Sequence, residues 1–146
     1  MIVYFDTSAF IPLIIDEPSS GSRERLWNEA TRAVSVRLLH VEARSALARA
    51  QRIGRLTHGG LASAVALLDD LSAQIDHVEI TDRLVRTAGD LAEEQHLRGY
   101  DAVHLAAART VADENTVFAS GDHDLIAAAA HLGLTVAPGK MRGTTE

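Results

Sequence analysis

The stretch Ile2-Val3-Tyr4-Phe5-Asp6-Thr7-Ser8-Ala9 opens with four apolar residues rich in β-formers and then turns polar at one position. A continuous apolar run of this length predicts a strand buried on both faces, as in parallel sheets. Such sheets bind ligands beyond the carboxyl ends of their strands, and Asp6 follows this strand directly. Asp6 is therefore a candidate site residue, with the N-cap of a helix starting near Ser8 as the alternative role.

Outward from this strand, short apolar runs alternate with helical patterns. Further strands are predicted at 33–36, 75–80, 116–119 and 134–136. Helices are predicted at 10–15, 19–30, 37–52, 57–73, 82–96, 101–111 and 125–131. Gly99 and Tyr100 are expected to lie outside helical structure and to separate the fifth predicted helix from the sixth. This alternation predicts an α/β domain around a central parallel sheet.

The composition is that of an ordinary globular chain, with 146 residues, 47% hydrophobic and 23% charged. Its length predicts one domain at 1–137 and a short tail at 138–146. The chain has no cysteine, which excludes a disulfide scaffold, a zinc–thiolate site and a cysteine nucleophile. No apolar run approaches the ~18 residues of a membrane span, and the first residues lack a basic signal-peptide region. We therefore expect a cytoplasmic protein without membrane association.

The charge balance is acidic, with 20 Asp and Glu against 14 Lys and Arg and a formal net charge of −6. This excess counts against broad electrostatic attraction to nucleic acid. A nucleic-acid function would therefore need a local reason, such as bound cations that reverse the charge of an acidic pocket.

A second acidic turn follows the strand at 116–119. Asp122 and Asp124 lie in this turn, so they are expected at the same sheet edge as Asp6. Asp124 directly precedes an apolar helix and looks like its N-cap. That assignment leaves Asp122 without an obvious structural role, which makes it the stronger functional candidate of the two.

Two further carboxylates occupy core-facing positions of predicted helices. Glu42 falls on the rim of the apolar stripe of the helix at 37–52, where a carboxylate is costly unless it is paired or binds a cation. An ion pair with Arg49 is the alternative. Asp101 opens its helix beside the buried face, and stabilisation by the helix dipole is the alternative for it. His104, one turn later, is a candidate for supporting these acids or an ordinary histidine at the edge of the core, and the ordinary role is favoured.

Together, two acids at the sheet edge and two on core-facing helix positions predict an all-oxygen cluster. Such clusters bind Mg²⁺ or Mn²⁺ rather than zinc. Carboxylates crowded without a cation would repel one another and raise one another's pKa. The chemistry that repeatedly uses this arrangement is phosphoryl transfer, in which the cation activates water and neutralises charge on the phosphate.

Five stretches of the chain, in order, are similar to the motifs of a known family. They are Ile2 to Ala9, Asp16-Glu17-Pro18, Leu38 to Leu47, Tyr100 to Ala108, and Ser120 to Leu125 with the closing run Gly133 to Val136. With these motifs the chain resembles the PIN-domain ribonuclease family, and most closely its VapC-type toxins from toxin–antitoxin pairs. The resemblance covers nearly the whole chain.

The resemblance implies a three-layer fold with a central parallel sheet of about five strands flanked by helices. It also implies Mg²⁺- or Mn²⁺-dependent endoribonuclease activity that leaves 5′-phosphate and 3′-hydroxyl ends. Four catalytic acids follow from the matched motifs: Asp6, Glu42, Asp101 and Asp122. Asp6 and Asp101 would hold the principal metal, with Asp122 and Glu42 completing the site. Supporting roles fall on Thr7, Ser120 and Asp124, and Arg49 is a candidate phosphate contact.

The expected partners are an RNA substrate, a cognate antitoxin protein and a second copy of the chain in a homodimer. Trp27, a lone tryptophan on a short polar helix, is the best candidate for an interface residue. The rival interpretation is a catalytically silent protein-binding module. Two other classes that use acids at a sheet edge do not fit. A haloacid-dehalogenase-like phosphatase needs an aspartate at the position of Ser8. A receiver domain needs a lysine near the last strand, whereas the only lysine, Lys140, lies beyond it.

Overall fold

The computed structural model describes residues 1–137; the predicted tail at 138–146, which contains Lys140, lies outside the described residues. Its centre is a five-stranded sheet in which every pair of neighbouring strands is parallel, in the order β3-β2-β1-β4-β5. The strands are β1 (Ile2–Phe5), β2 (Arg32–Val36), β3 (Asp76–Val78), β4 (Thr116–Ala119) and β5 (Thr135–Val136). The predicted five-stranded parallel sheet is confirmed.

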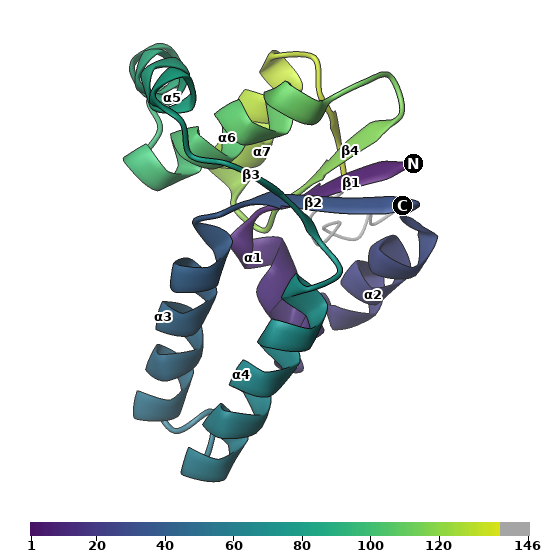
Figure 1. Ribbon diagram of the computed structural model, residues 1–146, viewed down its shortest axis with the longest axis vertical. Helices are drawn as coiled ribbons and strands as arrows, with labels where there is room; N and C mark the ends of the chain where they lie inside the picture. Colours follow the sequence, from purple (N-terminus) through teal and green to yellow (C-terminus); the bar gives the residue numbers. More distant parts are fainter. Residues whose placement is uncertain (138–146) are drawn as a thin grey trace, which may run out of the picture.

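Helices cover both faces of the sheet, which gives the expected three layers (Figure 1). On one face lie α1 (Thr7–Phe10), the 3₁₀ turn η1 (Ile11–Leu13), α2 (Ser20–Glu29), α3 (Leu39–Arg52) and α4 (His58–Ser72). On the other lie α5 (Asp82–Gln95), α6 (Gly99–Val111) and α7 (His123–His131). None of the helices within residues 1–137 has the length and hydropathy of a membrane-spanning segment.

The apolar run of β1 is explained by its position between two cores. Val3 and Phe5 belong to the core under α1, α3 and α4, whereas Tyr4 belongs to the core under α5, α6 and α7, and all three are 0% exposed. Successive strand residues point to opposite faces, so a strand covered on both sides must be apolar at every position. Trp27 is partly buried and packs against the first core, on Phe5 and Phe10, and its role as an interface residue stays a prediction.

The strand order reverses at β1, because β2 and β3 lie on one side of it and β4 and β5 on the other. In open parallel sheets, such a reversal leaves a crevice at the carboxyl ends of the two diverging strands. Phe5 pairs with Ala119 in the register of β1 and β4, and the Asp6 amide donates to the Ala119 carbonyl at 3.1 Å. The residues that follow, Asp6 and Ser120, therefore leave the sheet side by side.

Two helix boundaries differ from the predictions. The first helix begins at Thr7, immediately after its N-cap Asp6, and the segment predicted as a helix at 10–15 is mostly the tight turn η1, with Pro12 inside it. Gly99 and Tyr100 were predicted to break the chain, but they are the first residues of α6. Asp101 is consequently the third residue of α6.

Candidate active site

Asp6 anchors the candidate site at the carboxyl end of β1. Its side chain is 4% exposed, and its Oδ1 accepts from Ser8 Oγ at 2.7 Å and from the Ala9 amide at 2.9 Å. Its Oδ2 accepts from Ser120 Oγ at 2.5 Å. Burial raises the pKa of Asp6, while His104, Ser120 and Ser8 lower it in part. Asp6 thus caps the N-terminus of α1 with Oδ1 and contacts Ser120, at the end of the neighbouring strand, with Oδ2.

Ser120, which directly follows the neighbouring strand β4, links Asp6 to Asp122. The Ser120 hydroxyl donates to Asp6 and accepts from the Asp122 amide at 3.0 Å. Asp122 Oδ1 in turn accepts from the Leu125 amide at 3.0 Å, which makes Asp122 the N-cap of α7. The prediction that Asp124 caps this helix is wrong, because α7 begins at His123 and places Asp124 inside its first turn.

Asp124 also lies apart from the other candidate residues. It is exposed and lines a separate hollow with Gln95 and His96. Among residues 1–137 it has no hydrogen bond to the other candidate acids. The structure therefore does not bring Asp124 into the group to which the resemblance assigned it.

Glu42 reaches the site from the first turn of α3 and is held by two side chains from other elements. Its Oε1 accepts from Thr7 Oγ1 at 2.8 Å and from His104 Nε2 at 2.6 Å. The alternative partner Arg49 lines the same hollow of about 390 Å³ as Glu42, but no ion pair joins the two within the described residues. Thr7, for which a supporting role was predicted, thus contacts a candidate catalytic acid.

Of the two roles left open for His104, the favoured one, an ordinary core-edge histidine, is wrong, and the alternative contact with a candidate acid is the one observed. Its ring is buried, with Nε2 on Glu42 and Nδ1 2.9 Å from the hydroxyl of the fully buried Tyr4. Burial raises the pKa of Tyr4, so its hydroxyl stays protonated and can donate to Nδ1. The sequence signal that could have identified His104 is its position one helical turn after Asp101, on the same face of the helix.

Asp101 and Asp122 share one cation, the guanidinium of Arg98. Arg98 Nε lies 3.4 Å from Asp101 Oδ2, and its Nη2 lies 3.3 Å from Asp122 Oδ2. Burial and the neighbouring Asp122 raise the pKa of Asp101, whereas Arg98 lowers it. Sequence reasoning missed Arg98, although a basic residue three positions before a candidate acid is a recognisable helix-pair spacing.

Three of the four carboxylates thus lie in two hydrogen-bonded groups at the crevice beside β1, and the fourth, Asp101, is linked to Asp122 through Arg98. One group joins Asp6 and Asp122 through Ser120, and the other joins Glu42 to His104 and Thr7. Carboxylate oxygens suit Mg²⁺ or Mn²⁺. Across residues 1–137, however, no three His, Asp or Glu side chains already stand as a group that could hold a metal ion. A cation bound by Asp101 and Asp122 would have to compete with Arg98.

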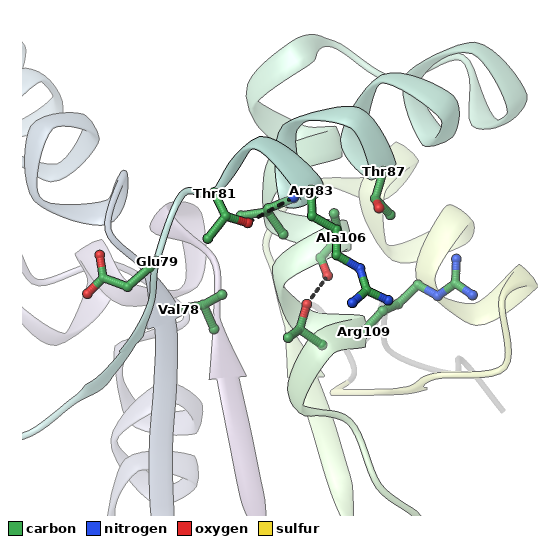
Figure 2. A pocket seen from close by; sticks show the side chains of 9 residues that line it. Val78, Glu79, Thr81, Arg83, Thr87, Ala106 and Arg109 are labelled. Carbon is green, nitrogen blue, oxygen red and sulfur yellow. Dashed lines mark hydrogen bonds between the residues drawn. The ribbon is translucent and has the colours of Figure 1, made fainter.

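A further hollow, of about 610 Å³, lies between β3, α5 and α6 and is shown in Figure 2. Its charged residues are Arg83, Arg109 and Glu79, and the Glu79 carboxylate points away from the two arginines and pairs with Arg37 at 2.8 Å. This hollow contains none of the predicted acids, so its lining does not suggest hydrolytic chemistry.

Comparison with known proteins identifies the family and agrees with the fold. The PIN domain family model matches residues 3–131. Ribonuclease VapC45 of Mycobacterium tuberculosis is 41% identical over 140 residues, which cover 96% of this chain and 97% of that protein. The crystal structure of Mycobacterium tuberculosis VapC20, a sarcin-ricin loop cleaving toxin, has a TM-score of 0.67 at 20% identity over 91% of this chain and 96% of that one. VapBC2 from Rickettsia felis, bound to a DNA fragment from its promoter, has a TM-score of 0.61 at 14% identity over 94% and 98%.

Proposed function

Because the chain belongs to the PIN domain family and to its VapC-type members, we propose that it is a metal-dependent endoribonuclease and the toxin of a toxin–antitoxin pair. The observation that carries the proposal is the convergence of Asp6, Glu42, Asp101 and Asp122 on the crevice where the strand order reverses. The name of the 41% identical relative, a ribonuclease, supports RNA as the substrate.

In this proposal Asp6, Asp101 and Asp122 hold Mg²⁺ or Mn²⁺, and Glu42 completes the site. The cation supplies a Lewis acid that lowers the pKa of water and neutralises charge on the phosphate. Ser120 fixes the orientation of the Asp6 carboxylate through its 2.5 Å hydrogen bond. Thr7 and His104 fix Glu42 in the same way, since both donate to one of its oxygens.

Arg49 is the proposed contact for an RNA phosphate. It lines the hollow that contains Glu42, together with the exposed ring of Tyr100, and it is not engaged in an ion pair with Glu42 in the part of the chain described. A guanidinium can bind phosphate oxygens through two parallel hydrogen bonds. Its position beside a candidate catalytic acid supports a role in holding the strand near the cleaved bond.

The proposed partners are an antitoxin and a second copy of the chain, in the cytoplasm. A VapBC complex is among the solved structures that share this fold, which supports an antitoxin partner. The homodimer rests on the family resemblance. Co-purification with the product of the adjacent open reading frame, followed by light scattering of the free chain and the complex, tests both.

Incubation of the purified protein with total RNA tests the nuclease proposal. Cleavage is expected with Mg²⁺ or Mn²⁺ and not with excess EDTA, and sequencing of the new ends is expected to give 5′-phosphates. Asp101→Asn should abolish cleavage while the circular dichroism spectrum stays native. Asp90→Asn, the same charge change at an exposed position of α5, is the matched control. Undiminished cleavage in EDTA would overturn the metal mechanism.

One observation favours a second candidate, the catalytically silent binding module. In the described residues no three acids form a ready metal group, and Arg98 neutralises two of them. A silent module would bind its antitoxin tightly but cut no RNA with either metal. Isothermal titration of Mn²⁺ into the free protein separates the two candidates, because the nuclease needs saturable binding that Asp101→Asn weakens.

A further inference from the structure

A hollow of about 330 Å³ adjoins the candidate active site on the far side of Ser8. Besides Ser8 of α1, it is lined by residues at or just before the starts of α2 and α7, namely Glu17, Pro18, Ser19, Arg23, Gly121 and His123. Ser8 separates it from the acids, because its Oγ donates to Asp6 Oδ1 and accepts from the Gly121 amide at 2.8 Å. The hollow is therefore one side chain away from the candidate catalytic carboxylates.

Arg23 is the feature of this hollow that needs an explanation. It is 2% exposed, and its Nη2 donates to the Ser120 carbonyl at 2.9 Å. Its Nε and Nη1 are buried and have no hydrogen-bond partner among residues 1–137. Burial lowers the pKa of Arg23, and the Asp6 carboxylate offsets part of this effect. Burying a cation with unpaired N–H groups is expensive, so an anionic partner would stabilise it.

The start of α2 adds to the positive character of the hollow. The ten-residue α2 starts at Ser20, and its N-cap Ser19 makes no capping hydrogen bond with its side chain. The nine-residue α7 also starts beside the hollow, at His123, but its N-terminus is already capped by the Asp122 carboxylate. Helix N-termini carry partial positive charge and free amides that bind phosphate groups. The acid on the rim, Glu17, is engaged by Arg55 at 3.6 Å.

We propose that this hollow binds a backbone phosphodiester of the RNA, next to the one that is cleaved, through the Arg23 guanidinium. The identity of the ligand as RNA rests on the proposed nuclease function. The anion site itself rests on the orphaned guanidinium and the uncapped start of α2. A phosphate held here would fix the register of the strand relative to Asp6, since Ser8 contacts both the hollow and that carboxylate.

A metal-free NMR titration tests the site without requiring any catalysis. Inorganic phosphate and then dimethyl phosphate, a diester probe, are added while the amide signals of Gly121 and His123 are followed. Saturable shifts are expected for both probes. Arg23→Gln should weaken phosphate binding by about tenfold or more. Arg25→Gln, the same charge change at an exposed position of the same helix, should leave it unchanged.

A third variant keeps the test decisive if Arg23→Gln fails to fold. Glu17→Gln removes the acidic charge from the rim and is expected to tighten phosphate binding by about twofold to fivefold, a gain that misfolding cannot imitate. The absence of saturable shifts at Gly121 and His123, or weakening equal in Arg23→Gln and Arg25→Gln, would overturn the proposal.

Different results would refute the proposed anion site and the proposed nuclease function. If the protein cleaves RNA with Mg²⁺, Arg23→Gln should raise KM by about tenfold while Arg25→Gln leaves it unchanged. An unchanged KM in Arg23→Gln would overturn the site and leave the nuclease standing. Phosphate binding at Gly121 and His123 in a protein that cuts no RNA would refute the nuclease proposal and support the anion site alone.

Discussion

Replacing Tyr4 by phenylalanine is expected to destabilise the protein through a single buried hydrogen bond. Tyr4 is fully buried in β1, and its ring stacks on Phe118 at 5.6 Å between centroids. These ring contacts persist in Tyr4→Phe. The hydroxyl, however, is the partner of His104 Nδ1 at 2.9 Å, while His104 Nε2 is directed at Glu42. The substitution therefore removes one hydrogen bond and leaves a buried ring nitrogen without a partner.

The size of the effect follows from this geometry. A buried polar atom that loses its partner costs about 1–3 kcal/mol in the free energy of unfolding. Because the ring stays in place, no cavity larger than a hydroxyl is added to this cost. In a chain of this length, each kcal/mol lowers Tm by roughly 3 °C, so Tyr4→Phe should unfold about 3–9 °C below the wild type.

Urea unfolding followed by circular dichroism measures the loss directly, with an unchanged m-value as the check on two-state behaviour. Tyr100→Phe is the matched control, since it removes the other tyrosine hydroxyl of the chain from a ring that is 65% exposed. Its effect should stay within about 0.5 kcal/mol. Equal stabilities of Tyr4→Phe and the wild type would refute the reasoning that His104 depends on this hydroxyl.

Three further predictions concern the acids and their neighbours. Burial raises the pKa of Asp6 in the folded state, so the stability of the wild type falls as the pH rises from the unfolded-state pKa to the raised one. Asp6→Asn carries no such charge and should have a higher urea midpoint than the wild type at pH 7. This advantage should disappear below a pH of about 4, where the carboxyl is protonated in both states. Arg98→Gln should tighten Mn²⁺ binding by up to about fivefold in calorimetry, because the competing guanidinium is gone, and weaker binding would contradict the competition. Asp122→Ala should lose about 1 kcal/mol as a removed N-cap, whereas Asp124→Ala should lose less than half of that, in parallel urea titrations.

The sequence was sufficient for the features that depend on strand burial and chain order. The run Ile2–Phe5 is apolar throughout because both of its faces are covered, and this identifies it as a central strand. Parallel neighbours then place Asp6 and Asp122 at one edge without knowledge of the loops. Glu42 was identified because its position on the helical wheel conflicts with its charge.

The sequence was insufficient where a side chain chooses among several partners. Arg49 and His104 were both within helical reach of a candidate acid, yet Glu42 bonds to His104, which is 62 residues away. That choice depends on how α3 and α6 approach across the sheet, which local periodicity does not encode. The N-cap of α7 shows the same limit at short range, because a shift of two residues in the helix start transfers the cap to Asp122.

The hydrogen bond between Asp6 and Ser120 joins residues that are 114 positions apart. Loop closure of this length must precede the contact, so the pocket is a late product of folding rather than a local one. During translation, a chain that has emerged only as far as α5 already contains Asp6 and Glu42 but not the other two acids. In the proposed nuclease, a chain of that length therefore lacks two of the four candidate catalytic acids.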